Sequence, residues 1–179
     1  MSTCDITSGF TLSCRDNTGG IKNIYILSGS VASVTGSGAV GLITGISGSG
    51  VFYKFELTRQ TGDYVETING STENGTVFYD QTVNASFHKM QSATRNQIRL
   101  LSKNVALKMI VETNNSPIGK FFYLGENNGL SLNAGQGQSG TAFGDANSYA
   151  LTFNGQESDP ASEISGSDLT PILVGITVG

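Results

Sequence analysis

Few residues of this chain could take part in catalysis or bind a metal, and the chain has a single histidine for either role. His88 is the only histidine among the 179 residues, so a Ser-His-Asp triad or a histidine-ligated metal site would have to use it. It falls on the polar side of a predicted strand, where a surface or interface histidine is the ordinary case. Cys4 and Cys14 could pair if the N-terminal segment folded back as a hairpin, although two reduced thiols are favoured. With one distant histidine they do not make a zinc set.

Two further patterns resemble parts of known sites. Gly36 to Gly41 match the G-x-G-x-x-G dinucleotide fingerprint, which needs a strand before it and a helix after it. Residues 42–45 cannot open a convincing helix, so we interpret the match as chance. Glu56 and Glu66 could meet across strands as paired carboxylates, but solvated strand acids are the usual case. The sequence therefore predicts no enzyme, no cofactor and no metal.

Composition favours one folded domain with a weakly charged surface. Hydrophobic residues make up 37% of the chain and charged residues only 13%, and 24 residues are glycine. A surface with so few charges offers little repulsion between copies of the protein. The net charge of −4 argues against a sequence-independent nucleic-acid binder, which needs a basic face. The chain shows neither a secretion signal nor an apolar run of membrane-spanning length, so we expect synthesis in the cytoplasm and no membrane partner.

Alternating apolar and polar residues predict strands along most of the chain, and one segment has helical periodicity. Strands are predicted at 21–27, 51–59, 64–68, 76–89, 105–112, 120–124, 130–132 and 149–153. Glycine-rich segments separate them: 28–50 is predicted as thin strands around a long loop, and 133–140 as a loop. The helix is predicted at about residues 92–104. The expected fold is mainly β, a β-sandwich or small β-barrel with one flanking α-helix.

The long strand at 76–89 has two different faces. One is apolar and is predicted to face the core: Val77, Tyr79, Val83, Ala85 and Phe87. The other is polar and thinly charged: Asp80, Thr82, Asn84, Ser86 and His88. Because side chains alternate along a strand, these two sets lie on opposite sides of the sheet.

The predicted helix carries the only concentrated charge. Thr94 and Gln97 have the spacing of a capping box, with Ser92 as a rival N-cap. The cations recur every four residues and so form one basic stripe: Arg95, Arg99 and Lys103. The stripe is either a plain solvated face or a surface that meets an acidic patch on another copy. The acidic residues proposed for that patch are Glu157, Asp159 and Glu163.

The composition shifts after Gln156. Residues 157–168 are small and acidic, as in a solvated linker, and 170–178 form an apolar strand without an obvious partner. We therefore divide the chain into a β domain with an N-terminal arm at 1–157 and a C-terminal extension at 158–179.

Several segments together resemble the tail tube proteins of long-tailed bacteriophages, which are related in fold to the tube of type VI secretion. The resemblance covers about residues 21–157 and is one of organisation and local phrasing. The segments that carry it are Phe52-Tyr53-Lys54-Phe55-Glu56-Leu57, Asn74-Gly75-Thr76-Val77-Phe78-Tyr79 leading into Phe87-His88-Lys89-Met90, Ala93-Thr94-Arg95-Asn96-Gln97-Ile98, Phe122 to Leu130, and Tyr149 to Glu157.

The resemblance implies a structural virion protein of the phage tail. Copies would form rings, typically hexameric, whose inner strands join into one lumen, and the rings would stack into a tube that conducts DNA. The polar face from Asp80 to His88 would line the lumen, where a thinly charged, acidic wall lets DNA slide. Residues 28–50 and the tail after Gln156 are candidates for contacts between stacked rings. The implied partners are further copies, other tail proteins such as the tape measure and terminator, and DNA that passes non-specifically through the lumen.

Two alternatives from other classes stay open. The chain could be a capsid decoration or head-surface protein, or a glycan-binding β-sandwich module of a virion. An enzyme is the least favoured class, because the chain lacks a set of reactive residues.

Overall fold

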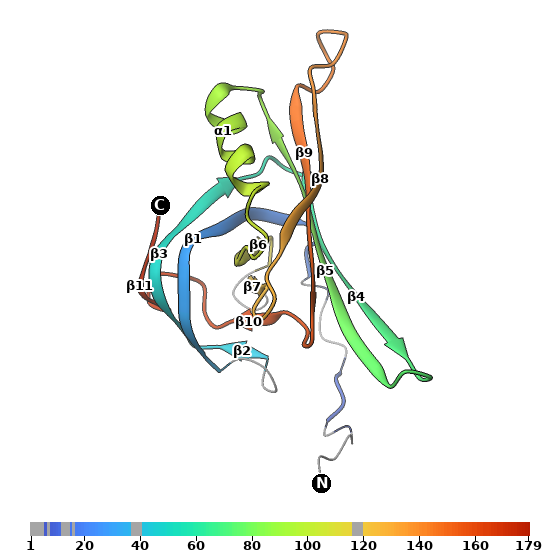
Figure 1. Ribbon diagram of the computed structural model, residues 1–179, viewed down its shortest axis with the longest axis vertical. Helices are drawn as coiled ribbons and strands as arrows, with labels where there is room; N and C mark the ends of the chain where they lie inside the picture. Colours follow the sequence, from blue (N-terminus) through green and yellow to red (C-terminus); the bar gives the residue numbers. More distant parts are fainter. Residues whose placement is uncertain (1–5, 7, 12–14, 16, 37–40, 116–119) are drawn as a thin grey trace.

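A computed structural model describes residues 6, 8–11, 15, 17–36, 41–115 and 120–179, and its strands form two sheets (Figure 1). The first, sheet A, has the strand order β11-β3-β1-β6-β7-β10-β2. The bounds of its strands are β1 (Ile21–Thr35), β2 (Leu42–Ile43), β3 (Gly45–Glu56), β6 (Met109–Thr113), β7 (Phe121–Leu124), β10 (Ser162–Ile164) and β11 (Leu173–Val178). The second, sheet B, has the order β4-β5-β9-β8. Its strands are β4 (Gly62–Ser71), β5 (Thr76–His88), β8 (Ser131–Gln138) and β9 (Ser148–Glu157).

Sheet A curls into a half-barrel around its own apolar core, which we call the barrel core. The barrel core draws on every strand of sheet A and on the turn before β11; its largest fully buried members are Tyr123, Phe52, Ile43, Ile46, Ile110 and Ile164. The other face of sheet A packs on sheet B and forms a second core, the intersheet core. Adjacent residues of β1 therefore enter different cores: Tyr25 lies in the barrel core and Ile26 in the intersheet core. Burial on both faces explains why this part of β1 is almost continuously apolar.

Sheet B is covered on one face only. Val83, Ala85 and Phe153 fill the intersheet core from its strands. The β4–β5 hairpin extends beyond the end of β9, which stops opposite Tyr79, and it projects from the body of the protein (Figure 1). The β8–β9 hairpin projects at the other end. Val77, expected in the core, is 60% exposed because it lies on the projecting part of β5.

The single helix, α1 (Ser92–Leu101), flanks the sheets (Figure 1). It is shorter than predicted, and its N-cap is Gln91, which makes no side-chain capping bond. The predicted capping box of Thr94 and Gln97, and Ser92 as a rival cap, are therefore wrong. None of its residues is fully buried, although Ile98 and Leu101 pack partly against the intersheet core. Among the described residues, no helix has the length and apolarity that a membrane crossing needs.

The glycine-rich segments contain more strand than the sequence predicted. β1 runs on to Thr35 and pairs with β3 through Gly29 and Gly50, so much of 28–50 is a hairpin rather than a loop. A Cβ on either glycine would collide with the facing backbone, which is why a close approach needs glycine here. Residues 131–138, predicted mostly as a loop, form edge strand β8 with β9 as its partner.

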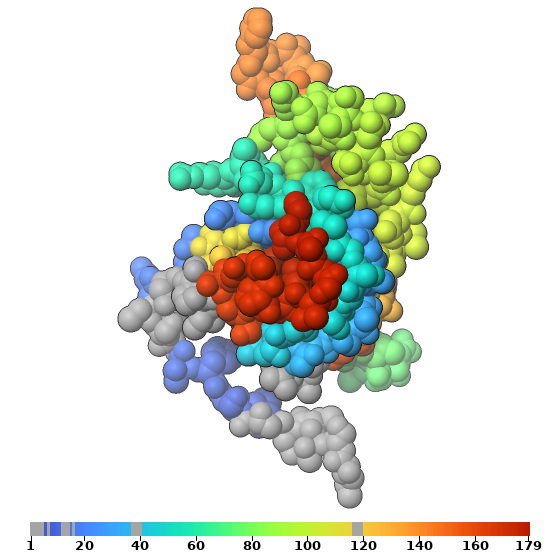
Figure 2. Space-filling view, turned by 90° about the vertical axis from the view of Figure 1, so that its left-hand side faces the viewer, coloured from blue at the N-terminus to red at the C-terminus, as the bar shows by residue number. Residues whose placement is uncertain are grey.

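The C-terminal residues belong to sheet A. The prediction of a solvated linker at 157–168 is wrong, because β10 lies there between β7 and β2. β11 pairs in parallel with β3, and Figure 2 shows the last residues lying over that part of the molecule. Ile164, Leu169, Ile172 and Ile176 are all buried in the barrel core. Residues 158–179, predicted as an extension, thus supply part of a core. The predicted fold class is confirmed: the chain is mainly β, with a curled half-barrel sheet, a second sheet and one helix.

Candidate functional site

The outer face of sheet B is the side that points away from the intersheet core. Along β5 the residues predicted for a channel wall alternate with buried Val83 and Ala85, so they share this outer face: Asp80, Thr82, Asn84, Ser86 and His88. The first four are half-buried among their neighbours and His88 is exposed. In Figure 1 no helix or strand covers this side of the sheet.

Polar side chains on neighbouring strands hold the outer face together. The amide Nδ2 of Asn84 donates to Oδ2 of Asp63 on β4 at 3.1 Å. On the opposite side, Thr152 of β9 donates its hydroxyl proton to Oδ1 of Asn84 at 2.9 Å. Farther across the sheet, Asn133 donates to Asn154. These bonds fix uncharged polar groups in rows across the strands, which gives a wall rather than a pocket.

Sheet B contains no cationic lysine or arginine. None of the chain's 10 Lys and Arg residues falls within β4, β5, β8 or β9. Two carboxylates, Asp63 and Asp80, lie on its outer face, and Oδ1 of Asp80 has no hydrogen-bond partner among the described residues. Such a face cannot gain affinity for a phosphate backbone by releasing its counterions, because that requires lysine or arginine.

Both edges of sheet B are open. β4 and β8 each pair with one strand only among the described residues. An open edge presents unpaired N–H and C=O groups, which can pair with a strand of another chain. Both edge strands run out into projecting hairpins, so each edge extends beyond the body of the protein.

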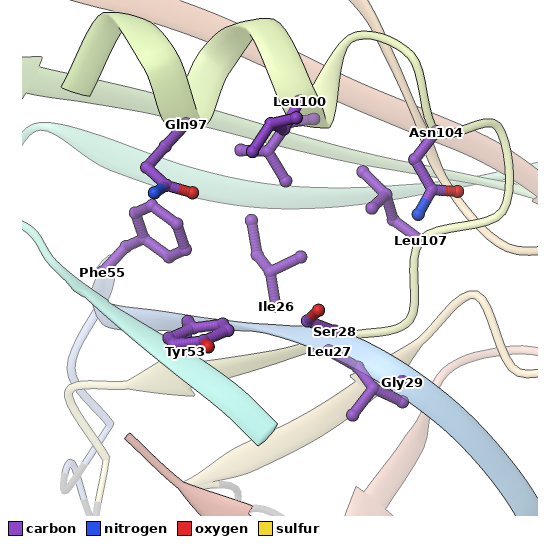
Figure 3. Close-up of a pocket in the computed structure, with 11 residues that line it drawn as sticks. Ile26, Leu27, Ser28, Gly29, Tyr53, Phe55, Gln97, Leu100, Asn104 and Leu107 are labelled. Atoms are coloured by element: carbon purple, nitrogen blue, oxygen red, sulfur yellow. The ribbon is translucent and has the colours of Figure 1, made fainter. Parts of the chain in front are cut away.

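The basic stripe of α1 lies on its solvent side, as predicted. Arg95 and Arg99 of α1 are exposed, and so is Lys103, which lies two residues after the end of the helix. Beneath the helix an apolar groove of about 190 Å³ separates α1 from β1 and β3. Figure 3 shows Leu100, Ile26 and Tyr53 pointing into it. Leu100 is 58% exposed and Tyr53 51% exposed, so the helix covers this part of the sheet loosely.

The acidic patch predicted for another copy's stripe is divided by the structure. Glu157 is buried at the end of β9, where Oε1 accepts hydrogen bonds from the amides of Asn128 and Gly129 at 2.9 and 3.0 Å. Its Oε2 accepts a third bond, from the amide of Asn127 at 3.0 Å. Glu157 is therefore committed to its own turn and does not belong to an exposed patch. Asp159 is exposed, and Glu163 is half-buried in β10.

Two buried polar residues were missed by sequence reasoning. Gln81 lies in β5, where its Oε1 accepts from the amide of Gly125 at 3.0 Å and its Nε2 donates to Glu66 at 3.3 Å. Glu112 of β6 accepts from Asn23 and Tyr25 at 2.6 and 2.9 Å. The available signal was their position: Gln81 lies between Tyr79 and Val83 on the predicted core face of β5, and Glu112 follows Ile110 on one face of β6. A buried polar group at such a position must be hydrogen-bonded.

The residues considered for catalysis do not converge. Glu56 lies in sheet A and pairs with Lys54 at 2.8 Å, whereas Glu66 lies in sheet B and accepts from Tyr64 at 2.8 Å. The G-x-G-x-x-G match leads from β1 into another strand, β2, not into a helix; its residues 37–40 lie outside the described part. Cys4 and Cys14 also lie outside it. Among the described side chains, no group of three or more His, Cys, Asp or Glu could hold a metal ion.

Comparison of the chain with protein-family models, with curated proteins and with solved structures gave no match.

Proposed function

We propose that this chain is a structural protein of a phage virion, whose copies assemble into stacked rings that form the tail tube through which DNA passes. In this proposal the outer face of sheet B lines the lumen. We call Asp80, Thr82, Asn84, Ser86 and His88 of β5 the wall residues, because in this proposal they face the lumen. The partners are further copies, tail proteins such as the tape measure and terminator, and DNA that slides without being bound.

The absence of lysine and arginine from sheet B is the observation that carries this proposal. The chain keeps its cations in sheet A, in α1 and in connecting segments. A conduit for DNA must be wet enough to avoid hydrophobic contacts and must lack cations that would hold phosphates. The outer face of sheet B lacks lysine and arginine and is mostly polar, with Asn, Thr, Ser and Gln side chains and two carboxylates, while Val65 and Phe78 are the large apolar residues on it.

The open edges of sheet B also support assembly. A ring of copies that pairs β4 of each copy with β8 of its neighbour would leave no edge exposed. Projecting hairpins would extend that pairing beyond the body of one subunit. The exposed apolar residues Ile68 and Val77, at 68% and 60%, lie on the β4–β5 hairpin and would become buried by such a neighbour.

Negative-stain microscopy of the purified protein over a range of concentrations tests the proposal. We expect rings, and then tubes, as the concentration rises. A protein that stays monomeric at high concentration, or that binds capsids or glycans as a monomer, contradicts the proposal.

The lumen assignment has its own test. Ser86→Cys, made with Cys4→Ser and Cys14→Ser, places one thiol on the outer face of sheet B. In assembled tubes it should react with a small maleimide and be protected from a maleimide carried on a large polymer. The same variant kept dilute and unassembled is the control, and it should react with both reagents. Reaction of the assembled form with the large reagent contradicts the assignment.

A further inference from the structure

A partly enclosed cavity of about 180 Å³ lies between the turn after β7 and the connection from β9 to β10. Three of its lining residues are acidic: Glu126, Glu157 and Asp159. Pro160 and Ala161 form part of its apolar wall. The cavity is larger than the space that one water molecule needs, and it lies apart from the outer face of sheet B, since Gln81, which lines it, is on the opposite side of β5 from the wall residues.

Tyr123 supplies an unpartnered polar group to this cavity. Its ring is 1% exposed and packs in the barrel core, while its hydroxyl has no hydrogen-bond partner among the described residues. Burial, followed by the charges of Glu126 and Glu157, raises the pKa of Tyr123, so the phenol stays protonated. A buried hydroxyl without a partner is unfavourable, and this one can both donate and accept a hydrogen bond.

The negative charge of the cavity is only partly compensated within the chain. The turn amides already bind Glu157, and the ammonium of Lys108 donates to the carbonyls of Gly125, Glu126 and Asn127 at 2.7, 3.1 and 3.2 Å. Glu126 has one long contact of 3.5 Å with the Ser162 hydroxyl. Asp159 accepts from the neighbouring Ser158 at 2.9 Å. Within the described part of the chain neither Glu126 nor Asp159 forms an ion pair.

We propose that this cavity binds an arginine side chain from α1 of a second copy of the chain, with Arg99 at the centre of the contact. This inference rests on the proposed self-assembly. A guanidinium is planar and has five N–H donors. The cavity offers it the carboxylates of Glu126 and Asp159 and the phenol oxygen of Tyr123 as acceptors. Arg95, Arg99 and Lys103 are exposed and form no ion pair within the described residues.

The place of the two surfaces in the fold makes the contact intermolecular. In Figure 1 α1 lies near one end of the body, while the β9–β10 connection lies near the other. The helix of one copy therefore cannot reach its own cavity. A contact between two different surfaces is heterologous, and it can repeat from copy to copy around a ring or along a stack.

A charge-swap cycle tests the contact through self-association, measured by sedimentation velocity over a range of concentrations. Arg99→Glu and Asp159→Arg should each weaken association at least tenfold, and the double variant should recover most of the loss. Glu73→Arg, which reverses an exposed acid on the β4–β5 turn far from the cavity, is the matched control for rescue: combined with Arg99→Glu it should not restore association. Single variants without effect, or a double variant that shows only the sum of two losses, overturn the proposal.

Tyr123→Phe provides a second measurement that a merely structural role would not reproduce. It removes the unpartnered hydroxyl and keeps the ring, so the midpoint of chemical denaturation of the dilute monomer should stay equal or rise. Association should nevertheless weaken severalfold. Unchanged association overturns the role of the phenol.

The outcomes also separate this inference from the proposed function. Tubes that form equally well with all the variants leave the tail-tube proposal standing and overturn the contact. Oligomers that depend on Arg99 and Asp159 but never become rings or tubes support the contact and contradict the tail tube. A wild-type protein that does not associate overturns both.

Discussion

Sheet A and sheet B differ in how their faces are covered. Sheet A buries both of its faces along β1 and β6, one in the barrel core and one in the intersheet core. Sheet B buries one face and leaves the other polar and uncovered. Among the described residues each sheet has two edge strands, β11 and β2 in sheet A and β4 and β8 in sheet B, but only the edge strands of sheet B run out into projecting hairpins. In the proposed assembly, sheet A would supply much of the stability of each copy, and sheet B would supply the surface that meets other copies.

The same contrast appears in the charges. Sheet A holds a buried network in which Glu112 lies 3.9 Å from Lys22 and 3.7 Å from Lys120. Sheet B has no lysine or arginine in any strand, and its buried Glu157 is bound by backbone amides. Ion pairs therefore support the sheet that is buried on both faces, and neutral donors support the sheet that has an uncovered outer face.

The largest expected effect concerns the barrel core. Phe52 is fully buried and Tyr53 next to it is 51% exposed. Phe52→Ala should lower the free energy of unfolding by about 3–5 kcal/mol, since it removes a buried ring and leaves a cavity. Tyr53→Ala should cost the monomer about 1 kcal/mol or less.

Denaturant unfolding followed by circular dichroism measures both. If Phe52→Ala does not fold, Phe52→Leu supplies the comparison with a smaller loss. An equal loss of unfolding free energy in the two alanine variants would contradict the assignment of Phe52, but not Tyr53, to the barrel core.

The next effect concerns Glu157, which sharpens the comparison because it is the buried charge of sheet B. Glu157→Ala removes the acceptor of three turn amides and should cost about 3 kcal/mol. Glu157→Gln keeps an oxygen acceptor and should cost less. Thermal unfolding of the two variants gives the order, and a stability equal to that of the wild type in both would show that the turn does not depend on this side chain.

The stability of the protein should depend on pH through Glu112 of sheet A. Burial opposes the charge on Glu112, but hydrogen bonds from Asn23 and Tyr25 and the charges of Lys120 and Lys22 outweigh it and lower the pKa of Glu112 below 4.5. A lowered pKa contributes stability that is present above the unfolded value near 4.5 and is lost as the pH falls toward the folded value.

Glu112→Gln should flatten that part of the acid limb in unfolding measurements between pH 6 and pH 3, a window of about three units around the unfolded value. The exposed Glu73→Gln is the control and should keep the wild-type slope. An unchanged slope in Glu112→Gln would show that the Glu112 network does not contribute to the loss of stability in acid.

The smallest effect on stability, but a direct test of function, is to add cations to sheet B. Thr82→Lys combined with Ser86→Lys should change the free energy of unfolding by only about 1 kcal/mol. Duplex DNA mixed with this variant before assembly should then co-sediment with the assembled protein, and the binding should fall steeply with salt.

Ser30→Lys combined with Ser49→Lys puts the same charge on exposed positions of sheet A and serves as the control. DNA retention no greater than in the wild type would contradict a lumen made by the outer face of sheet B.

Local patterns made much of this fold predictable. The alternation at 76–89 predicted both faces of β5, and the Asn-Gly pairs at 69–75 are typical of a tight connection such as the one in the β4–β5 hairpin. The cation spacing predicted an exposed stripe on α1. Side-chain periodicity is a property of a few consecutive residues, so a sequence can show it without reference to distant parts of the chain.

The errors came from long-range contacts. Residues 162–164 and 131–138 are strands only because β7 and β9 lie beside them. Val77 continues an apolar pattern, but it is exposed because the hairpin outruns its neighbours. Glu157 looked like a surface acid because its three amide donors lie about thirty residues earlier in the chain.

The sequence by itself determined that this is a β-rich chain with one helix, one polar strand face and few residues for catalysis, because composition and periodicity are local properties. Only the tertiary structure decided that the four strands without lysine or arginine share one sheet with open edges. It alone brought the Tyr123 hydroxyl to an acidic cavity far from the basic stripe of α1. Strand order and burial depend on which distant segments meet, and that is set by the packing of the whole chain.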